Sequence, residues 1–272
     1  MNEAFEFVTT RSQGLAAAGV IVGASDSLVN TCRLLVDPTR IAEGMIEVKD
    51  TIVVYAISSE ARFEAFRGVV SKIGPNGGMY QIEGVTESSY ALVDPAPVAT
   101  WQNVTAQRVL MDLLSATRLT ITNVSVSSTL SDVFLHTWHT EGRSVAQEIQ
   151  ALFSSVAPSV RVFGSLDGRT ILGTREEIAK MFGILIYPSN DAAGETDADV
   201  SRFSLRVGFP GTTYLDHAGR FFGTLDAVVH RIAPGRAYTD LYLDDEWSDD
   251  LAAWATSPAQ KSLIVDDSLE ED

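Results

Sequence analysis

The chain has 272 residues, of which 45% are hydrophobic and 21% are charged. This composition excludes a disordered chain, and the length suits one large domain or two modest domains with a buried core. Lys and Arg total 20 against 36 Asp and Glu, which gives a net charge of −16. This charge disfavours tight binding to nucleic-acid phosphates or to anionic lipid, and a basic partner fits better.

Cysteine usage and hydropathy set two further limits. Cys32 is the only cysteine, so no intrachain disulfide forms, and we expect it to be a small buried hydrophobic residue. The N-terminus has no basic segment of the kind that opens a secretory signal. The longest apolar run, residues 15–24, is too short to span a bilayer. We expect a soluble protein made in the cytoplasm, with no membrane contact.

The first part of the chain, residues 5–92, has the pattern of β structure. Residues 45–50 alternate between apolar and polar side chains, residues 51–57 are rich in β-branched side chains, and residues 63–73 continue to a turn at 75–78. Residues 80–83 then return as the partner strand. Short strands with Gly-rich turns predict a small barrel or sandwich.

Residues 98–187 predict an α+β unit with three helices. The first begins after Thr105, which can cap it, and the second and third begin at the capping boxes of Ser144 and Thr174. Gly183 is placed to end the third helix. The apolar faces consist of Ala106, Val109, Leu110, Leu113 and Leu114; Val145, Ile149, Leu152, Phe153 and Val156; and Ile178, Met181 and Phe182. Strands are expected between the helices, at 119–126, 160–163, 170–172 and 184–187.

The chain then returns to β structure, with strands expected at residues 202–207, 221–232 and 238–243. The fold class is mainly β with an α+β insertion. Residues 240–272 hold eleven acids and one base, a net charge of −10, which is typical of a solvated extension or a docking peptide. The predicted units are a first β-barrel module (1–94), the α+β insertion (95–198), a second β-barrel module (199–246) and an acidic extension (247–272).

The two β regions share a hairpin pattern. Residues 69–77 (VVSKIGPNG) match residues 228–235 (VVHRIAPG) with one inserted Asn, and Tyr80 and Tyr238 follow at equal spacing. Pro–Gly turns are common, so chance convergence is one explanation. We favour duplication, which makes the two barrel modules an internal repeat. Three such chains would present six similar modules in a pseudo-sixfold ring.

Several of these segments resemble a known family. The runs 207–211 (VGFPG), 219–223 (GRFFG), 228–230 (VVH) and 238–243 (YTDLYL) resemble the closing hairpins of baseplate hub proteins of contractile-tailed bacteriophages. Residues 101–110 (WQNVTAQRVL) resemble the helix that follows the first barrel of those proteins. The resemblance covers most of residues 5–246, and it is architectural because it contains no invariant chemical motif.

The resemblance implies a structural protein of the virion tail baseplate. It implies a homotrimeric ring between the sixfold tail tube protein and the threefold spike protein, which is a separate chain, and contacts with neighbouring baseplate proteins. Genomic DNA would pass through the lumen without specific binding, because an acidic wall repels phosphate. One alternative is a hexameric protein of the distal tube end or tail completion. The other is a hydrolase with a site near His136 or His217.

Candidate chemical groups are few. His136 and His139 are the only close histidine pair, but the surrounding residues predict a strand, where this spacing separates the rings and disfavours a shared metal. Asp216 and His217 are expected in a loop, and no Gly-x-Ser-x-Gly motif accompanies them. His230 is expected to be a hydrogen-bonded strand residue.

The other candidates have structural interpretations. Glu176 and Glu177 lie in a first helical turn, where carboxylates interact favourably with the helix dipole. Gly14, Gly19 and Gly23 match no nucleotide-binding motif and predict a flexible loop. The four tryptophans are expected to be core or interface residues: Trp101, Trp138, Trp247 and Trp254. The sequence therefore predicts a non-enzyme with no catalytic, cofactor-binding or metal-binding residues, whose functional sites are interfaces.

Overall fold

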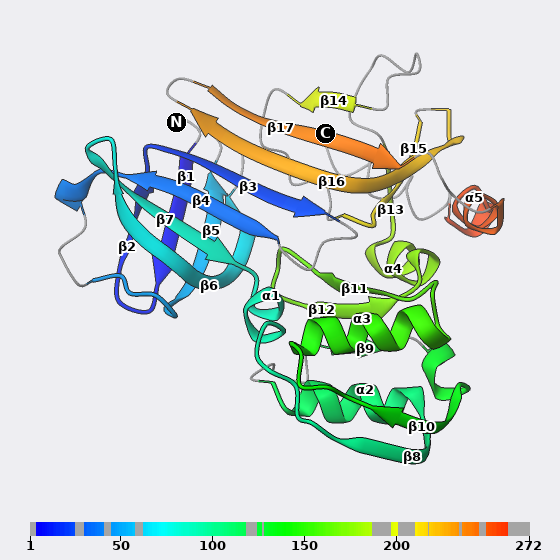
Figure 1. Cartoon of the computed structure of the whole chain (residues 1–272). Helices are drawn as coiled ribbons and strands as arrows, with labels where there is room; N and C mark the ends of the chain where they lie inside the picture. The colour runs from blue at the N-terminus through cyan, green and yellow to red at the C-terminus, as the bar shows by residue number, and fades with distance from the viewer. Residues whose placement is uncertain are drawn as a thin grey trace.

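The computed structural model describes most of the chain and shows a mainly β protein with several helices (Figure 1). One large mixed sheet is accompanied by a two-stranded and a three-stranded sheet. The described residues are 4–24, 30–40, 45–57, 62–117, 124–126, 128–186, 197–200, 210–216, 218–233, 236–244 and 249–260. None of the helices found among them is long and apolar enough to cross a bilayer.

The large sheet contains strands from both ends of the chain. The N-terminal strands are β1 (Ala4–Thr9), β2 (Gln13–Ala16), β3 (Ala18–Ala24), β4 (Thr31–Val36), β5 (Thr51–Ile57), β6 (Arg62–Asn76) and β7 (Met79–Val85). The C-terminal strands are β13 (Ile184–Ile186), β14 (Asp197–Val200), β15 (Thr213–Leu215), β16 (Phe221–Ala233) and β17 (Arg236–Asp244). The strand order is β13-β15-β16-β3-β4-β7-β6-β5-β1-β2, with β17 between β16 and β14.

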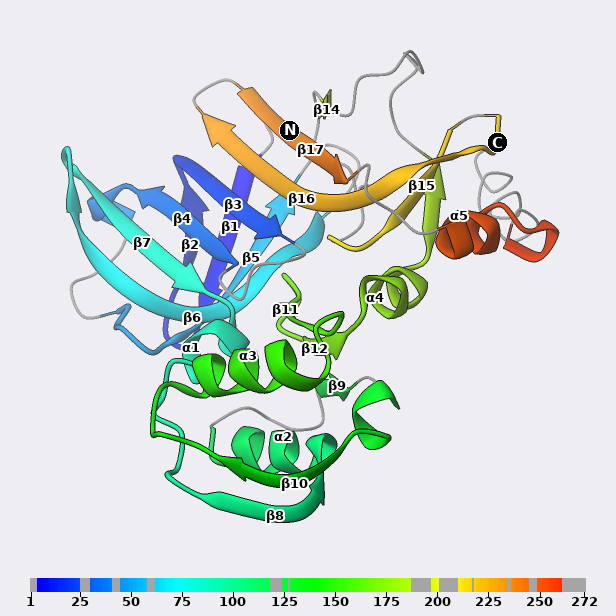
Figure 2. The ribbon, with the colours of Figure 1, turned by 45° about the vertical axis from the view of Figure 1, so that its right-hand side comes forward.

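The N-terminal strands curve around a common core, as both views show (Figures 1 and 2). Phe5, Phe7 and Phe66 are fully buried there. The Ala17 N–H donates to the Leu35 carbonyl at 2.8 Å, which brings the end of β2 close to β4. The strand order nevertheless ends at β2, so the described part of the chain shows a strongly curved sheet and no closed barrel.

The two β regions are joined through their strands. β16 pairs antiparallel with β3, from Ala227 opposite Ala24 to Ile232 opposite Gly19. Both predicted β regions therefore contribute to one continuous sheet, not to two separate sheets. The predicted domain boundaries stay predictions. The predicted insertion, residues 95–198, includes β13 and the start of β14, and both strands pair with strands of the large sheet.

The two hairpins of the predicted repeat are both present, as β6–β7 and β16–β17. Their registers differ at the matched residues. Tyr80 pairs with Pro75, whereas Tyr238 pairs with Arg231. Pro75 lies in the ladder and not in the turn, which consists of Gly77 and Gly78 with φ of 57° and 84°. Equivalent topology is observed, but a residue-by-residue internal repeat is not.

Two sequence expectations in the N-terminal region are wrong. Residues 45–50 form bends and turns instead of a strand, and Lys49 has φ of 81°. Gly14, Gly19 and Gly23 lie in the strands β2 and β3 and not in the expected flexible loop. These glycines are required by packing, since a Cβ at Gly14 would lie 2.9 Å from the Phe7 ring.

The α+β unit lies below the large sheet in both views (Figures 1 and 2). Its helices are α2 (Ala106–Ser115), α3 (Val145–Val156) and α4 (Arg175–Phe182), and α1 (Glu87–Ala91) precedes it. Its strands are β8 (Thr100–Thr105), β9 (Val124–Val126), β10 (Phe134–His139), β11 (Arg161–Gly164) and β12 (Thr170–Gly173).

The predicted helix starts are confirmed. Thr105 accepts a hydrogen bond from the Arg108 N–H, and Ser144 and Thr174 form complete capping boxes. Two details are wrong. Met181 is 44% exposed, and the first half of the segment 101–110 is the strand β8 rather than helix.

The C-terminal region is partly described. Residues 249–255 form helix α5 (Asp249–Ala255), in which Leu251 and Ala255 are buried. This part of the expected acidic extension therefore packs on the protein. The predicted strand at 202–207 and residues 261–272 lie outside the described residues.

Candidate functional site

The two neighbouring histidines lie on β10, as the strand prediction requires. The His136 ring contacts Phe134 edge-on, with ring centroids 5.7 Å apart. His139 forms a hydrogen bond of 2.9 Å between its Nδ1 and the Thr100 hydroxyl. The described residues contain no group of three or more His, Cys, Asp or Glu that could hold a metal.

Asp216 organises the turn between β15 and β16. Its carboxylate accepts hydrogen bonds from the Arg220 N–H at 2.8 Å, from Arg220 Nε at 2.7 Å and from the Ala218 N–H at 2.9 Å. The backbone hydrogen bond from Arg220 and the adjacent guanidinium keep the Asp216 pKa below its usual value. These bonds occupy both carboxylate oxygens in the turn. Its predicted partner, His217, lies outside the described residues.

His230 is a buried strand residue, and the predicted hydrogen bond is confirmed. Its Nδ1 lies 2.8 Å from the Thr239 hydroxyl on β17, and its ring packs edge-on against Phe63. Burial lowers its pKa to about 4. The ring is therefore neutral at physiological pH, and at 4% exposure it has almost no access to solvent.

The remaining candidates have structural positions. Glu177 is the N3 residue of α4, and its carboxylate accepts the Thr174 N–H at 2.8 Å. Cys32 is buried, which raises its pKa to about 12 and keeps it a thiol. Trp101 donates to Asp112 at 2.9 Å and pairs across the strands with Trp138. Trp247 lies outside the described residues.

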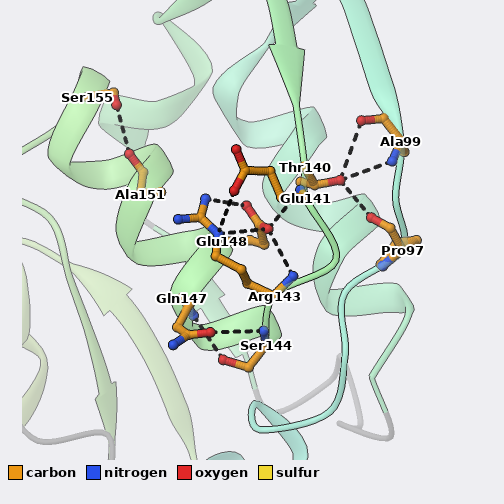
Figure 3. Close-up of polar contacts among 10 residues, drawn as sticks. All are labelled: Pro97, Ala99, Thr140, Glu141, Arg143, Ser144, Gln147, Glu148, Ala151 and Ser155. Atoms are coloured by element: carbon orange, nitrogen blue, oxygen red, sulfur yellow. Dashed lines mark hydrogen bonds and ion pairs between the residues drawn. The ribbon is translucent and has the colours of Figure 1, made fainter.

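The structure adds one polar cluster that the sequence analysis did not find (Figure 3). The side chain of Glu148, on α3, is fully buried, and Arg143 pairs with it at 3.0 Å. Its Oε1 also accepts the backbone N–H groups of Glu141 and Arg143, at 3.0 and 3.3 Å. Burial opposes ionisation of Glu148, but these donors outweigh it and hold its pKa below the usual value.

Thr140 extends this cluster to the segment that enters the α+β unit. Its hydroxyl donates to the Pro97 carbonyl at 2.6 Å and accepts from the Ala99 N–H at 3.0 Å. The Ala96 N–H donates to the Arg143 carbonyl at 2.8 Å. Glu148 and Thr140 therefore fix the entry segment, the end of β10 and the start of α3 relative to one another.

A sequence signal for this cluster existed. Glu148 lies on the apolar face of α3 beside Val145, Ile149 and Leu152, all fully buried. A carboxylate on such a face needs an internal partner, because burial of an unpaired charge is costly. These hydrogen bonds fix the neighbouring segments in place, which is a structural role. Among the described residues around the cluster, no nucleophile is paired with a base.

Comparisons with known proteins show similarity in the fold and not in the sequence. No family model matches the chain, and no curated protein matches its sequence. Among solved structures, a tail protein from Neisseria meningitidis MC58 matches with a TM-score of 0.61 and 12% identity, over 95% of this chain and 100% of that chain. The 43 kDa tail protein of prophage MuSo2 from Shewanella oneidensis matches with a TM-score of 0.64 and 10% identity, over 89% and 98%.

A third match comes from a secretion system. The E. coli c3393 protein is described as a component of the type VI secretion system with structural similarity to the T4 bacteriophage tail proteins gp27 and gp5. It matches with a TM-score of 0.60 and 10% identity, over 89% of this chain and 77% of that chain. At these identities the fold alone is shared. The chain thus has the fold of phage tail proteins.

Proposed function

We propose that this chain is a structural, non-enzymatic protein of a phage tail. The observation that carries the proposal is the extent of the fold match. Two proteins named as tail proteins align over 89–95% of this chain and 98–100% of their own chains. The correspondence therefore includes the large sheet and the α+β unit together, not one common motif.

Within the tail, we propose the position of the baseplate hub. The chain would form a homotrimeric ring that joins the sixfold tail tube to the threefold central spike. The hairpins β6–β7 and β16–β17 belong to one sheet, and the described parts of the matched segments, residues 69–77 and 228–233, lie in them. The equivalent topology of the two hairpins supports two related β modules per chain, which a trimer would arrange with pseudo-sixfold symmetry.

The proposed partners follow from that position. They are two further copies of the chain, the tail tube protein, a separate spike protein and neighbouring baseplate proteins. Genomic DNA would pass through the lumen without specific binding, which the net charge of −16 favours. The protein would be assembled in the host cytoplasm and reside in the virion.

The test is the solution mass by light scattering, combined with negative-stain class averages of the same sample. We expect three times the chain mass of 29.4 kDa and a ring with six similar lobes. Six times the chain mass would favour the distal tube-end alternative. A monomer that stays monomeric at high concentration, and also when mixed with the tube and spike proteins of the same tail, would contradict the proposal.

A further inference from the structure

The tip of the β11–β12 hairpin reaches from the α+β unit into the large sheet. Leu166, at this tip, is 1% exposed and packs in the core of the large sheet. By contrast, Phe163 and Ile171, on the strands of the same hairpin, pack with Ile178 of α4. The sheet core is therefore completed by a side chain from another part of the fold.

The space for the Leu166 side chain exists because β3 has a glycine, Gly23, at this position. A Cβ at Gly23 would lie 2.8 Å from Leu166 Cδ1 and 2.9 Å from its Cγ. The Leu166 carbonyl also accepts the Arg67 N–H of β6 at 2.6 Å. At the end of the tip, Gly168 has φ of 85°, and a Cβ there would lie 3.2 Å from Arg67 Cδ. Leu166 thus occupies a socket between β3 and β6.

The tip makes hydrogen bonds within itself and to neighbouring segments, but one of its buried side-chain groups has no partner among the described residues. The side-chain amide of Asn30, a fully buried residue, donates to the Gly164 carbonyl. Ser165 is also fully buried, and its hydroxyl has no hydrogen-bond partner among the described residues. Burial of an unpaired hydroxyl is unfavourable, and exposure to water would remove this cost.

We propose that residues 164–169 form a latch between the α+β unit and the sheet. The latch opens locally while the sheet and the helices α2 and α3 stay folded. Burial of Leu166 favours the closed state, whereas hydration of Ser165 favours the open state. Local opening then needs less free energy than global unfolding. This inference goes beyond the proposed tail function and does not depend on it.

Hydrogen exchange of the full chain tests the latch. The reporters are the Arg67 amide, which donates to Leu166, and the Gly168 amide, which donates to the Ser165 carbonyl at 2.9 Å. We expect Leu166→Ala, which empties the socket, and Gly23→Ala, which fills it, to accelerate both amides at least about tenfold. Amides of α2, α3 and β1 should stay slower than both reporters in every variant, because they exchange only on wider unfolding. Ser165→Ala should slow the reporters, because it removes the unpaired hydroxyl.

Gly19→Ala is the matched control on the same strand. A Cβ there would lie 2.9 Å from Leu34 and Phe5, with no contact to the tip. We expect it to accelerate exchange in the sheet without singling out the two reporter amides. If Arg67 and Gly168 exchange only together with β1 in every variant, the tip is a permanent part of the core and the latch is wrong. If Leu166→Ala does not fold, Gly23→Ala and Ser165→Ala decide the question.

Discussion

At the scale of single residues, the folded structure holds each of two buried ionisable groups in one protonation state. Glu148 is ionised because the Arg143 guanidinium and two backbone N–H groups face it. His230 is neutral because burial disfavours its charged form. Both groups have a higher pKa in the unfolded chain than in the folded protein. Each one therefore makes the folded protein less stable as the pH falls.

Glu148→Gln is expected to lower the free energy of unfolding by about 2 kcal/mol at neutral pH, since hydrogen bonds to a charged group are lost. The folded pKa lies below the ordinary value of 4.5. The contribution of Glu148 is therefore complete above about pH 4.5 and is lost as the pH falls through the folded pKa. Urea unfolding at several pH values should show the difference between variant and wild type shrinking in acid.

Glu141→Gln provides the comparison for Glu148. Glu141 also pairs with Arg143, at 3.7 Å, but its side chain is 70% exposed. Exposed ion pairs contribute little, so this variant should unfold near the wild-type midpoint. An equal loss in both variants would contradict the role assigned to burial.

His230→Gln is expected to reduce the acid sensitivity of the protein. The pKa of His230 falls from 6.5 to about 4 on folding, so the unfolded chain binds the additional proton between these pH values. Stability is complete above about pH 6.5 and decreases toward about pH 4, by about 3 kcal/mol over that interval. Thermal unfolding between these pH values should depend less on pH in His230→Gln, with His136→Gln as the control for histidine number.

At the scale of elements, the β6–β7 hairpin depends on the left-handed backbone of its turn. Gly77 and Gly78 have φ of 57° and 84°, with open space where a Cβ would lie. Gly78→Ala is expected to cost about 1 kcal/mol because of backbone strain alone. Gly74→Ala is the control, since its site is equally open and lacks a positive φ. Chemical denaturation should separate the two variants.

The elements also show what sequence patterns can and cannot predict. The helix starts were predictable because caps such as Ser144 and Thr174 act within four residues. The role of Gly19 and Gly23 was not predictable from the sequence. The side chains that fill the space above them, Phe5, Leu34 and Leu166, are distant in sequence. Residues 45–50 alternate like a strand but form turns, in which the Arg11 side chain bonds to Glu47 and Asp50.

The same distinction applies to the polar cluster around Glu148. An acid within an apolar stripe signals a buried partner, but the identity of that partner depends on the path of the loop before α3. Thr140 contacts Pro97 and Ala99, more than 40 residues earlier in the chain. A single sequence does not reveal such a pairing.

At the scale of the whole molecule, charge governs association. Each chain carries a net charge of −16, so copies repel one another at low ionic strength. We expect self-association to increase when salt rises from about 0.01 M to about 0.15 M, where the screening length shortens from about 30 Å to about 8 Å. Light scattering across this range measures the effect, and an assembly that weakens with salt would point to ion pairs at the interface instead.

The pairing of β3 with β16 has a consequence for synthesis on the ribosome. β3 is complete at residue 24, but its neighbour spans Phe221–Ala233. The nascent chain therefore carries β3 with one unpaired edge while nearly two hundred further residues are translated. Unpaired edges invite pairing with other chains, and contacts between distant segments form slowly. The growing chain is most exposed to aggregation during this interval, which ends only when β16 emerges and pairs with β3.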